Sequence, residues 1–444
     1  MKKFFLKTMG CQMNDHDSEV IRGLLLSLGY AETEEVEEAD LILYNTCCVR
    51  ENPERKVYGH MAGYKRLKEA KPHLLIGICG CMTQQKEERQ NILRELPHVD
   101  LIFGTHNIHR LPELLARAEG GERVVEVWDE APYEEEGQDF RENLPVERSH
   151  RLKAFVNIIY GCTNFCTYCI VPYVRGKEHS RLPESILTEV EGLVEAGYKE
   201  VTLLGQNVNA YGKDLSIDTS FSQLLTELNA IEGLARIRFT TSHPRDLGPD
   251  LIDALAGLDK VCEHLHLPVQ AGSSRVLRRM NRGYTREQYL DLVQKVRQAV
   301  PEIALTTDII VGFPGETEGD FQETLSLVEE VRFDSAFTFI YSPREGTPAA
   351  RFADQVPEEV KKERIYRLIE LQNKISAEHI QGLVGTKQEV LVEGTDGQGL
   401  VGRTRTNRQV HFAGSQELMG ELVTVEITEA GTWTLRGRVV QPQA

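Results

Sequence analysis

The sequence lacks any hydrophobic run of about 18 residues, the length that a membrane-spanning helix needs. It also lacks the pattern of a secretory leader, because Lys7 interrupts the short apolar segment at the N-terminus and Gly10-Cys11-Gln12 follows it. We therefore expect a cytoplasmic protein without a membrane segment. The composition is ordinary for a globular chain, with 41% hydrophobic and 27% charged residues, and 444 residues suffice for about three domains.

Basic residues are fewer than acidic residues, 51 against 68. The formal net charge is -17, which taken alone argues against a nucleic-acid partner. The distribution of charge weakens that exclusion: residues 129–147 hold eight acids and one base, whereas residues 148–181 hold six bases and one acid, and residues 273–285 hold four arginines and no acid. A local basic surface is therefore compatible with the acidic total.

An even set of cysteines suited to disulfides is also absent, and nine cysteines in a cytoplasmic chain indicate metal ligands or catalysts. Three of them, Cys162, Cys166 and Cys169, lie within eight residues. Cysteine thiolates are the usual ligands of iron–sulfur clusters, and three on one loop can hold a four-iron cluster with one iron left open. The alternatives are a disulfide loop or a zinc knuckle, but zinc requires a fourth ligand and His179 lies ten residues past Cys169.

Strands and helices alternate through residues 1–118, where the first domain is expected. The strand candidates are 2–7, 40–44, 74–79 and 99–103, and the helix candidates are 15–29, 53–68, 84–96 and 108–118. This alternation predicts an α/β domain with a doubly wound parallel sheet. Residues 119–147 are acidic and predict a solvated linker.

Cys11, Cys47 and Cys81 each follow a predicted strand of this domain. Ligands gather at the carboxyl ends of strands in open α/β sheets, so these loops predict a second site of three thiolates. The alternative is a set of ordinary buried cysteines, because cysteine is often buried. Cys79 is expected in the core, and only one of Cys47 and Cys48 can easily point at the site.

Residues 148–382 continue the alternation in six longer units. The strand candidates are 154–160, 200–205, 236–241, 263–269, 304–311 and 336–341, and the helix candidates are 183–196, 221–231, 249–257, 273–280, 286–300, 317–331 and 358–383. Six such units predict a partial (β/α)6 barrel, whose chemistry lies at the carboxyl ends of the strands. The loop that begins at Cys162 follows the first strand, as this rule requires.

Polar residues follow the other strands of the predicted barrel. Gln206 and Asn207 follow the second strand, Ser242 follows the third, and Gln270 follows the fourth. Each alone is typical of loop capping, but together they outline a ligand pocket.

The last segment, residues 383–444, changes character. Five short β-branched or alternating runs separated by glycine turns predict a small all-β barrel. Such modules often bind RNA through basic side chains, for which Arg403 and Arg405 are candidates. The segment also carries seven acids, so a capping or interface domain is the alternative.

The loop CTNFCTYC, with Tyr168 before its last cysteine, resembles the signature of radical S-adenosylmethionine (SAM) enzymes. The strings MGCQMN, NTCCVREN, GICGCM and GCTNFCTYCIVPYVRG, together with the C-terminal β module, resemble the methylthiotransferases in order along essentially the whole chain. The strings KVYGHMAGYKRLK and CTYCIVPYVRGKEHSR are most similar to the tRNA-modifying branch, and the β module resembles the TRAM domain. One departure is the doubled cysteine, where the motif register makes Cys47 the ligand and Cys48 the replacement of a small residue.

The resemblance implies two 4Fe-4S clusters and S-adenosylmethionine as cofactors, with one cluster on each three-cysteine site. The cluster ligands are then Cys11, Cys47, Cys81, Cys162, Cys166 and Cys169. It implies transfer of a methylthio group to carbon 2 of N6-isopentenyladenosine beside the anticodon of tRNA. An aromatic C–H bond is unactivated, so this reaction requires radical chemistry from a cofactor. By the resemblance, the site of Cys162, Cys166 and Cys169 generates the radical, and the site of Cys11, Cys47 and Cys81 supplies the sulfur.

The same reasoning gives the expected contacts and partners. The backbone near Tyr168 and the strand-end residues Gln206, Asn207, Ser242 and Gln270 are expected to hold S-adenosylmethionine. Arg175, Lys177 and Arg181 are expected to contact tRNA phosphates, with a solvated basic face as the alternative. The expected partners are an isopentenylated tRNA and an electron donor such as flavodoxin or ferredoxin, and the chain is expected to be a monomer.

Two other functions stay open at this point. One is the same chemistry on a threonylcarbamoyladenosine tRNA or on a ribosomal protein. The other is a non-catalytic, metal-bound RNA-binding protein.

Overall fold

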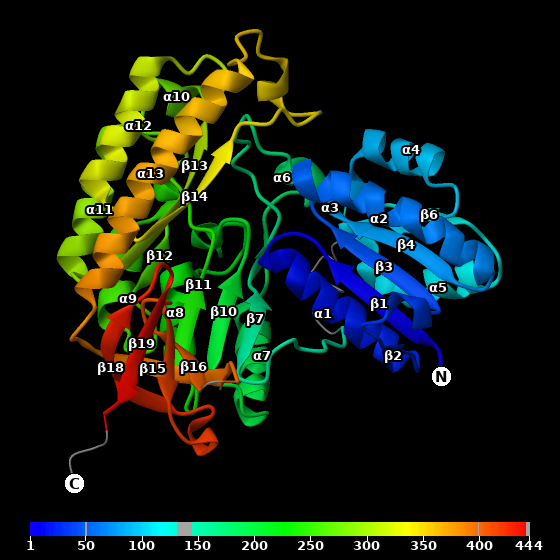
Figure 1. The fold of residues 1–444 in the computed structure, drawn as a ribbon, viewed down its shortest axis with the longest axis horizontal. Coiled ribbons are helices and arrows are strands. Elements are labelled where there is room, and N and C mark those ends of the chain that lie inside the picture. The colour runs from blue at the N-terminus through cyan, green and yellow to red at the C-terminus, as the bar shows by residue number, and fades with distance from the viewer. Residues whose placement is uncertain (49–50, 131–143, 398, 441–444) are drawn as a thin grey trace.

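The fold comes from a computed structural model, which describes residues 1–48, 51–130, 144–397 and 399–440, with the backbone alone at 51–55. Figure 1 shows three parts: an N-terminal sheet flanked by helices, a central curved sheet covered by long helices on its outer side, and a small C-terminal barrel. This order confirms the predicted α/β class with an added all-β module.

The N-terminal part is a six-stranded parallel sheet in the order β2-β1-β3-β4-β5-β6. The strands are β1 (Lys3–Thr8), β2 (Ala31–Glu32), β3 (Leu41–Thr46), β4 (Leu75–Gly80), β5 (Leu101–Phe103) and β6 (Val124–Glu126). The helices are α1 (Gln12–Ser27), α2 (Glu51–Ala70), α3 (Cys81–Gln84), α4 (Lys86–Glu95) and α5 (Leu111–Glu119). One core cluster joins the sheet to α1 and α5, and another joins it to α2 and α4, so helices cover both faces as the sequence predicts.

The strand β6 lies inside the range 119–147 that the sequence analysis assigned to a solvated linker. Its β-branched residues Val124 and Val125 pair in parallel with β5 and extend the sheet. Leu144 and Val146 pack against the core on the α1 side, and the Glu147 amide donates to the Glu19 carbonyl oxygen (3.0 Å). The described residues at both ends of this range therefore belong to the sheet domain, and residues 131–143 lie outside the described part.

The central part contains six parallel strands in chain order. They are β7 (Lys153–Asn157), β10 (Glu200–Leu204), β11 (Arg236–Phe239), β12 (His264–His266), β13 (Ala304–Val311) and β14 (Ser335–Ile340). They form two three-stranded sheets that an isolated parallel bridge between Ile237 and Val261 connects. Each strand lies where the sequence predicts one, so the partial (β/α)6 barrel is confirmed. A short antiparallel pair, β8 (Ile159–Tyr160) and β9 (His179–Ser180), flanks the first strand.

All helices of the central part except α6 (Val171–Val174) pack on the outer face of the curved sheet (Figure 1). They are α7 (Pro183–Glu195), α8 (Phe221–Asn229), α9 (Pro249–Gly257), α10 (Ser274–Arg279), α11 (Arg286–Ala299), α12 (Glu318–Val331) and α13 (Glu358–Gly382). Local chemistry sets several of their starts. Thr285 and Thr317 form capping boxes with Gln288 and Asp320, which satisfy backbone donors in the first turn.

The C-terminal part is a closed barrel in the order β15-β16-β17-β19-β18. Its strands are β15 (Lys387–Thr395), β16 (Leu400–Thr404), β17 (Gln409–Ala413), β18 (Leu422–Ala430) and β19 (Thr434–Val439). Two buried arginines of β11 attach it to the central sheet: Arg236 Nη1 donates to the Arg403 carbonyl oxygen (2.7 Å), and Arg238 Nη1 donates to that of Arg405 (2.7 Å). The predicted all-β module is therefore confirmed.

Among the described residues, we find no helix that is both long enough and apolar enough to cross a membrane.

Candidate metal centres

The first candidate centre is the loop of Cys162, Cys166 and Cys169, which lies between β8 and α6. Gly161 opens the loop with φ +67°, and a Cβ there would overlap the Lys177 carbonyl oxygen, so glycine is required. The Cys162 amide donates to the Gly176 carbonyl oxygen (3.0 Å), which closes the loop on the segment that follows it.

The thiols of this loop are protected from water. Cys162 and Cys166 are buried and Cys169 is partly buried. Burial raises the pKa of Cys162 to about 11 and that of Cys169 to about 12. A bound metal centre would favour the thiolate form, because a nearby cation lowers the pKa of a coordinating thiol. Three thiols on one short loop, two of them buried, therefore fit an iron–sulfur cluster.

No group of three or more His, Cys, Asp or Glu side chains in the described ranges lies close enough to hold one metal ion. A four-iron cluster does not need such a group, because each cysteine binds a different iron.

Arg282 is a buried neighbour of this loop that the sequence analysis counted only as part of a basic stretch. Its Nη1 donates to Cys166 Sγ (3.4 Å), and its Nη2 donates to the Pro268 carbonyl oxygen (2.8 Å). The contact joins residues 116 positions apart, so no local sequence signal could have indicated it. A hydrogen bond to a ligating sulfur is one of the features that tune an iron–sulfur cluster.

The second candidate centre lies at the carboxyl edge of the N-terminal sheet. Cys11, Cys47 and Cys81 follow β1, β3 and β4, which are adjacent strands in the sheet order. The structure therefore brings together the three loops that the sequence singled out. Cys47 and Cys81 are buried, and Cys11 is exposed.

Two asparagines join these loops. Asn14 accepts a hydrogen bond from Cys11 Sγ (3.4 Å) and donates to Asn45 Oδ1 (3.1 Å) and to the Thr46 carbonyl oxygen (3.1 Å). Gly80 has φ +94°, and a Cβ there would overlap the Asn45 side chain. These contacts tie the Cys11 loop to the end of β3 and bring the end of β4 close against it.

Cys48 has a defined place beside this centre. It packs in one cluster with Cys81, Ile170 and Val174. A hydrogen bond with Cys48 lowers the pKa of Cys81 to about 7, and the positive charge of Arg175 acts in the same direction. Cys47 as the third ligand stays a prediction, because both members of the pair are buried.

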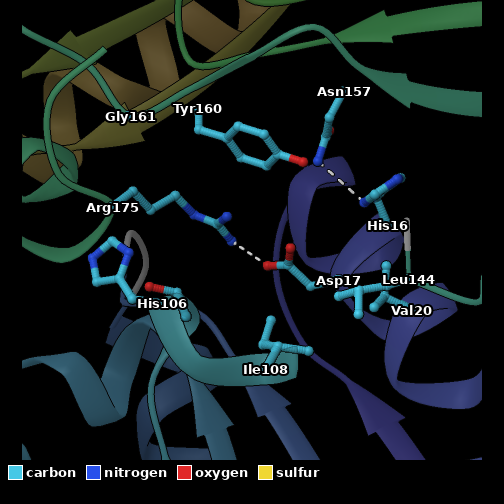
Figure 2. A pocket seen from close by; sticks show the side chains of 11 residues that line it. His16, Asp17, Val20, His106, Ile108, Leu144, Asn157, Tyr160, Gly161 and Arg175 are labelled. Atoms are coloured by element: carbon cyan, nitrogen blue, oxygen red, sulfur yellow. Dashed lines mark hydrogen bonds and ion pairs between the residues drawn. The ribbon is translucent and has the colours of Figure 1, made fainter. Parts of the chain in front are cut away.

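The two centres adjoin each other across the boundary between the sheet domain and the central part. The helix α6 follows Cys169 and packs on α3, which begins at Cys81. Thr105 Oγ1 donates to the Val174 carbonyl oxygen (2.9 Å). Figure 2 shows the boundary: Arg175 points from the central part to Asp17 on α1, and Asn157 meets His16 (3.1 Å). These residues line a cavity with a volume of about 30 Å³, which admits water but no cofactor.

The residues expected to hold S-adenosylmethionine lie at the carboxyl ends of the central strands. Asn207 is buried and donates from Nδ2 to Asp246 (2.8 Å), and Gln206 is half-buried beside it. Within the described part of the chain, Asn207 Oδ1 and Ser242 Oγ are buried without a hydrogen-bond partner. Gln270 adopts φ +71°, and its amide donates to the Asp308 carbonyl oxygen (2.9 Å).

Unpartnered buried polar atoms are costly unless a ligand or water satisfies them. The edge of the barrel next to the Cys162 loop therefore fits a polar cofactor. Tyr168 packs its ring against the central core, which leaves its backbone at the loop.

The expectation that Arg175, Lys177 and Arg181 contact tRNA phosphates is wrong for two of the three residues, and so is the alternative of a solvated basic face. Arg175 and Arg181 are buried. Arg181 Nη1 donates to Glu189 (2.6 Å) and to the Asn157 carbonyl oxygen (2.7 Å). The charges of these arginines offset buried carboxylates, so they are not available to phosphates. Lys177 is exposed, as the prediction requires.

The two arginines predicted to bind RNA on the barrel differ in the same way. Arg405 forms ion pairs with Glu263 (2.7 Å) and donates to the Val261 carbonyl oxygen (2.7 Å), so it ties the barrel to the central part. Arg403 is partly exposed and donates to the Asn407 carbonyl oxygen (3.1 Å). Its role in RNA binding stays a prediction.

Three family models match the chain. They are the Radical SAM superfamily over residues 156–328, the Uncharacterized protein family UPF0004 over residues 3–104, and the TRAM domain over residues 381–440. Their limits follow the three parts of the fold. The Radical SAM superfamily implies a 4Fe-4S cluster and S-adenosylmethionine.

The chain is similar over its whole length to proteins named tRNA-2-methylthio-N(6)-dimethylallyladenosine synthase. The one from Acetivibrio thermocellus is 56% identical over 444 residues, which span 99% of this chain and 91% of that protein. The one from Clostridium botulinum (strain Hall) is 54% identical over 441 residues, which span 99% of this chain and 97% of that protein.

Solved structures share the fold at low identity. The radical S-adenosylmethionine methyltransferase TsrM from Kitasatospora setae has a TM-score of 0.57 at 14% identity, covering 88% of this chain and 81% of that one. The cobalamin-dependent S-adenosylmethionine radical enzyme OxsB has a TM-score of 0.52 at 14% identity, covering 84% of this chain and 56% of that one. These likenesses support the radical SAM fold alone.

The relatives above carry the assignment, because more than half of the residues are identical from end to end and both three-cysteine sites fall within the aligned length. The resemblance found in the sequence is therefore confirmed. The chain belongs to the tRNA-2-methylthio-N(6)-dimethylallyladenosine synthase family of the radical SAM superfamily.

Proposed function

We propose that the protein is a tRNA methylthiotransferase, which adds a methylthio group to carbon 2 of N6-isopentenyladenosine beside the anticodon. One observation carries the proposal: two three-cysteine sites, each at the carboxyl edge of a parallel sheet, adjoin across one domain boundary. The names of relatives that are 54% and 56% identical support the same reaction.

Each three-cysteine site would hold one 4Fe-4S cluster. One cluster would bind to Cys162, Cys166 and Cys169, and the other would bind to Cys11, Cys47 and Cys81 of the N-terminal loops. When bound, such clusters with S-adenosylmethionine supply the one-electron chemistry that an unactivated aromatic C–H bond requires.

The surrounding residues bind and orient. Asn207, Ser242 and Gln270 at the strand ends, with Gln206 and the backbone of Tyr168, would hold S-adenosylmethionine beside the Cys162 loop. The hydrogen bond from Asn207 to Asp246 would orient Asn207 for this role. Arg282 would orient Cys166 through its hydrogen bond to Sγ. Cys162 and Cys166 are buried, which would shield these ligands from water and limit side reactions.

The proposal extends to the partners. The tRNA would approach over the exposed Lys177 beside the Cys162 loop and the partly exposed Arg403 of the barrel, since basic side chains contact phosphates. A reductant such as flavodoxin or ferredoxin would supply the electrons.

The deciding experiment is the nucleoside profile of tRNA from a strain in which this gene is deleted. The methylthio mark on N6-isopentenyladenosine should disappear and unmodified N6-isopentenyladenosine should accumulate. Complementation with the wild-type chain should restore the mark, and a Cys162→Ala variant should not. An unchanged profile would refute the proposal, and loss of a mark on threonylcarbamoyladenosine instead would redirect it to that substrate.

A further inference from the structure

Arg175 belongs to the central part by sequence but reaches into the N-terminal part. It follows α6, six residues after Cys169, and its side chain is 7% exposed. Its Nη2 donates to Asp17 Oδ2 (2.8 Å; Figure 2) and to Asn14 Oδ1 (3.4 Å), and both acceptors lie on α1. A residue adjoining one three-cysteine loop therefore ends beside the other.

The contacts of Arg175 point to the cysteines of the N-terminal loops. Asn14 Oδ1, which accepts from Arg175, also accepts from Cys11 Sγ. Arg175 thus shares the acceptor Asn14 Oδ1 with Cys11, one of the predicted ligands, and this contact places the guanidinium beside the N-terminal loops.

A fixed positive charge has a predictable effect at such a site. A four-iron cluster on three thiolates carries net negative charge, and one-electron reduction adds another negative charge. The reduction potential of a cluster depends on nearby charge and on hydrogen bonds to its sulfur ligands. Groups outside the ligand shell orient the ligands and tune the metal centre.

We infer that Arg175 is a positioning residue of the N-terminal centre, supplied across the domain boundary by the central part, and that its charge raises the reduction potential of the cluster there. This inference rests on the proposed function, because it requires a cluster on Cys11, Cys47 and Cys81. Through Arg175, the domain that generates the radical would thus help to set the reduction potential of the sulfur-supplying centre.

The chain offers a matched control in Arg148. Its side chain is 8% exposed, and it also reaches α1, through Glu19 (3.3 Å), while pairing with Glu189 (2.5 Å). The contacts described for Arg148 include no cysteine. Loss of Arg148 therefore removes a buried ion pair at the same boundary without changing the charge beside the N-terminal loops.

The test uses the full chain with Cys162, Cys166 and Cys169 replaced by alanine, so that only the N-terminal cluster assembles. After anaerobic reconstitution, iron and sulfide are counted, and the midpoint potential is measured by dithionite titration followed by electron paramagnetic resonance. Arg175→Met should lower the potential, Arg175→Lys should lower it less, and Arg148→Met should leave it unchanged. Equal potentials in the Arg175→Met and Arg148→Met variants would overturn the inference.

A fourth variant separates charge from misfolding. Asp17→Asn leaves the Arg175 charge uncompensated and should raise the midpoint potential. Structural damage would instead shift the potentials of Arg175→Met and Asp17→Asn in the same direction. If the Arg175→Met variant binds no cluster, the Asp17→Asn variant provides the test, and an unchanged or lowered potential in it refutes the inference. Absence of any cluster in the parent triple variant would instead count against the proposed function.

Discussion

At the scale of single residues, Gly161 sets the geometry of the radical SAM loop. Its φ of +67° is unfavourable for other residues, and an added Cβ would overlap the Lys177 carbonyl oxygen. We expect Gly161→Ala to cost more than the roughly 1–2 kcal/mol of left-handed strain, because the backbone itself must move. The variant should lose the cluster of this loop, measured as about half of the reconstituted iron.

Gly29→Ala is the matched control for this change. Gly29 has φ +82°, and nothing lies within 4 Å of an added Cβ. The Gly29→Ala variant should have a lower melting temperature because of the conformational strain, but it should bind as much iron as the wild type. Equal iron loss in both variants would show that strain, rather than the overlap with Lys177, explains the effect.

His264 on β12 should make stability fall in acid. Burial lowers the pKa of His264 to about 3, and the charge of Arg238 acts in the same direction. The unfolded chain takes up a proton near pH 6.5, so the neutral ring stabilises the fold fully above about pH 6.5. This contribution is lost as the pH falls from about 6.5 to about 3, by at most about 1.4 kcal/mol per pH unit.

The measurement is the melting temperature of the wild type and of His264→Gln between pH 7.5 and pH 5. The gap between them should narrow as the pH falls, because only the wild type loses the histidine contribution. His73→Gln controls for loss of an exposed histidine. A gap that widens in acid would contradict the assignment.

At the scale of elements, the strand β11 attaches the C-terminal barrel to the central sheet. Arg236 is fully buried and donates to the Arg403 carbonyl oxygen and to Glu389 (2.9 Å). It also pairs with the buried Glu200 (4.0 Å), and removing one partner of a buried ion pair costs about 3–5 kcal/mol. We expect Arg236→Met to loosen the barrel and to expose residues 383–386, between α13 and β15, to limited proteolysis.

An exposed arginine of the barrel provides the comparison. The Arg438 side chain is 72% exposed and pairs with Glu426 (2.9 Å). Arg438→Met should change stability by no more than about 0.5 kcal/mol and leave the cleavage pattern unchanged. Cleavage at 383–386 in neither variant would show that other contacts hold the barrel.

The elements themselves were largely predictable. Periodicity in the sequence located the six central strands and the five barrel strands, because each buries a regular apolar face. It missed β6, which is three residues long and gains its place only from pairing with β5. It also missed α3, a single turn of four residues at Cys81–Gln84, while the predicted helix 84–96 corresponds to α4.

At the scale of the whole molecule, the two three-cysteine sites should assemble independently. Alanine at Cys162, Cys166 and Cys169 should remove about half of the iron and all reductive cleavage of S-adenosylmethionine. Alanine at the N-terminal ligands, Cys11, Cys47 and Cys81, should also remove about half of the iron but leave that cleavage. Iron analysis with a cleavage assay under dithionite measures both results.

Two outcomes would contradict this division of roles. Loss of all iron from either triple variant would mean that the sites depend on each other to assemble. Zinc in place of iron in the anaerobically purified wild type would favour a non-catalytic protein.

The sequence by itself determined the fold class, the order of the three parts and the two groups of cysteines. Each depends on local spacing: apolar period within a strand or helix, and cysteines placed directly after strands. The family resemblance rests on the same contiguous strings, which is why relatives at 54% and 56% identity confirmed it.

Only the tertiary structure decided what surrounds those cysteines. Arg175 and Arg181 look like surface bases in the sequence, yet both are buried: Arg175 pairs with Asp17, 158 positions away, and Arg181 pairs with Glu189 on α7. Arg282 reaches Cys166 across 116 positions, and Cys48 reaches Cys81 across the sheet edge. Burial and ion pairing depend on which elements pack against each other, and local periodicity contains no information about those long-range contacts.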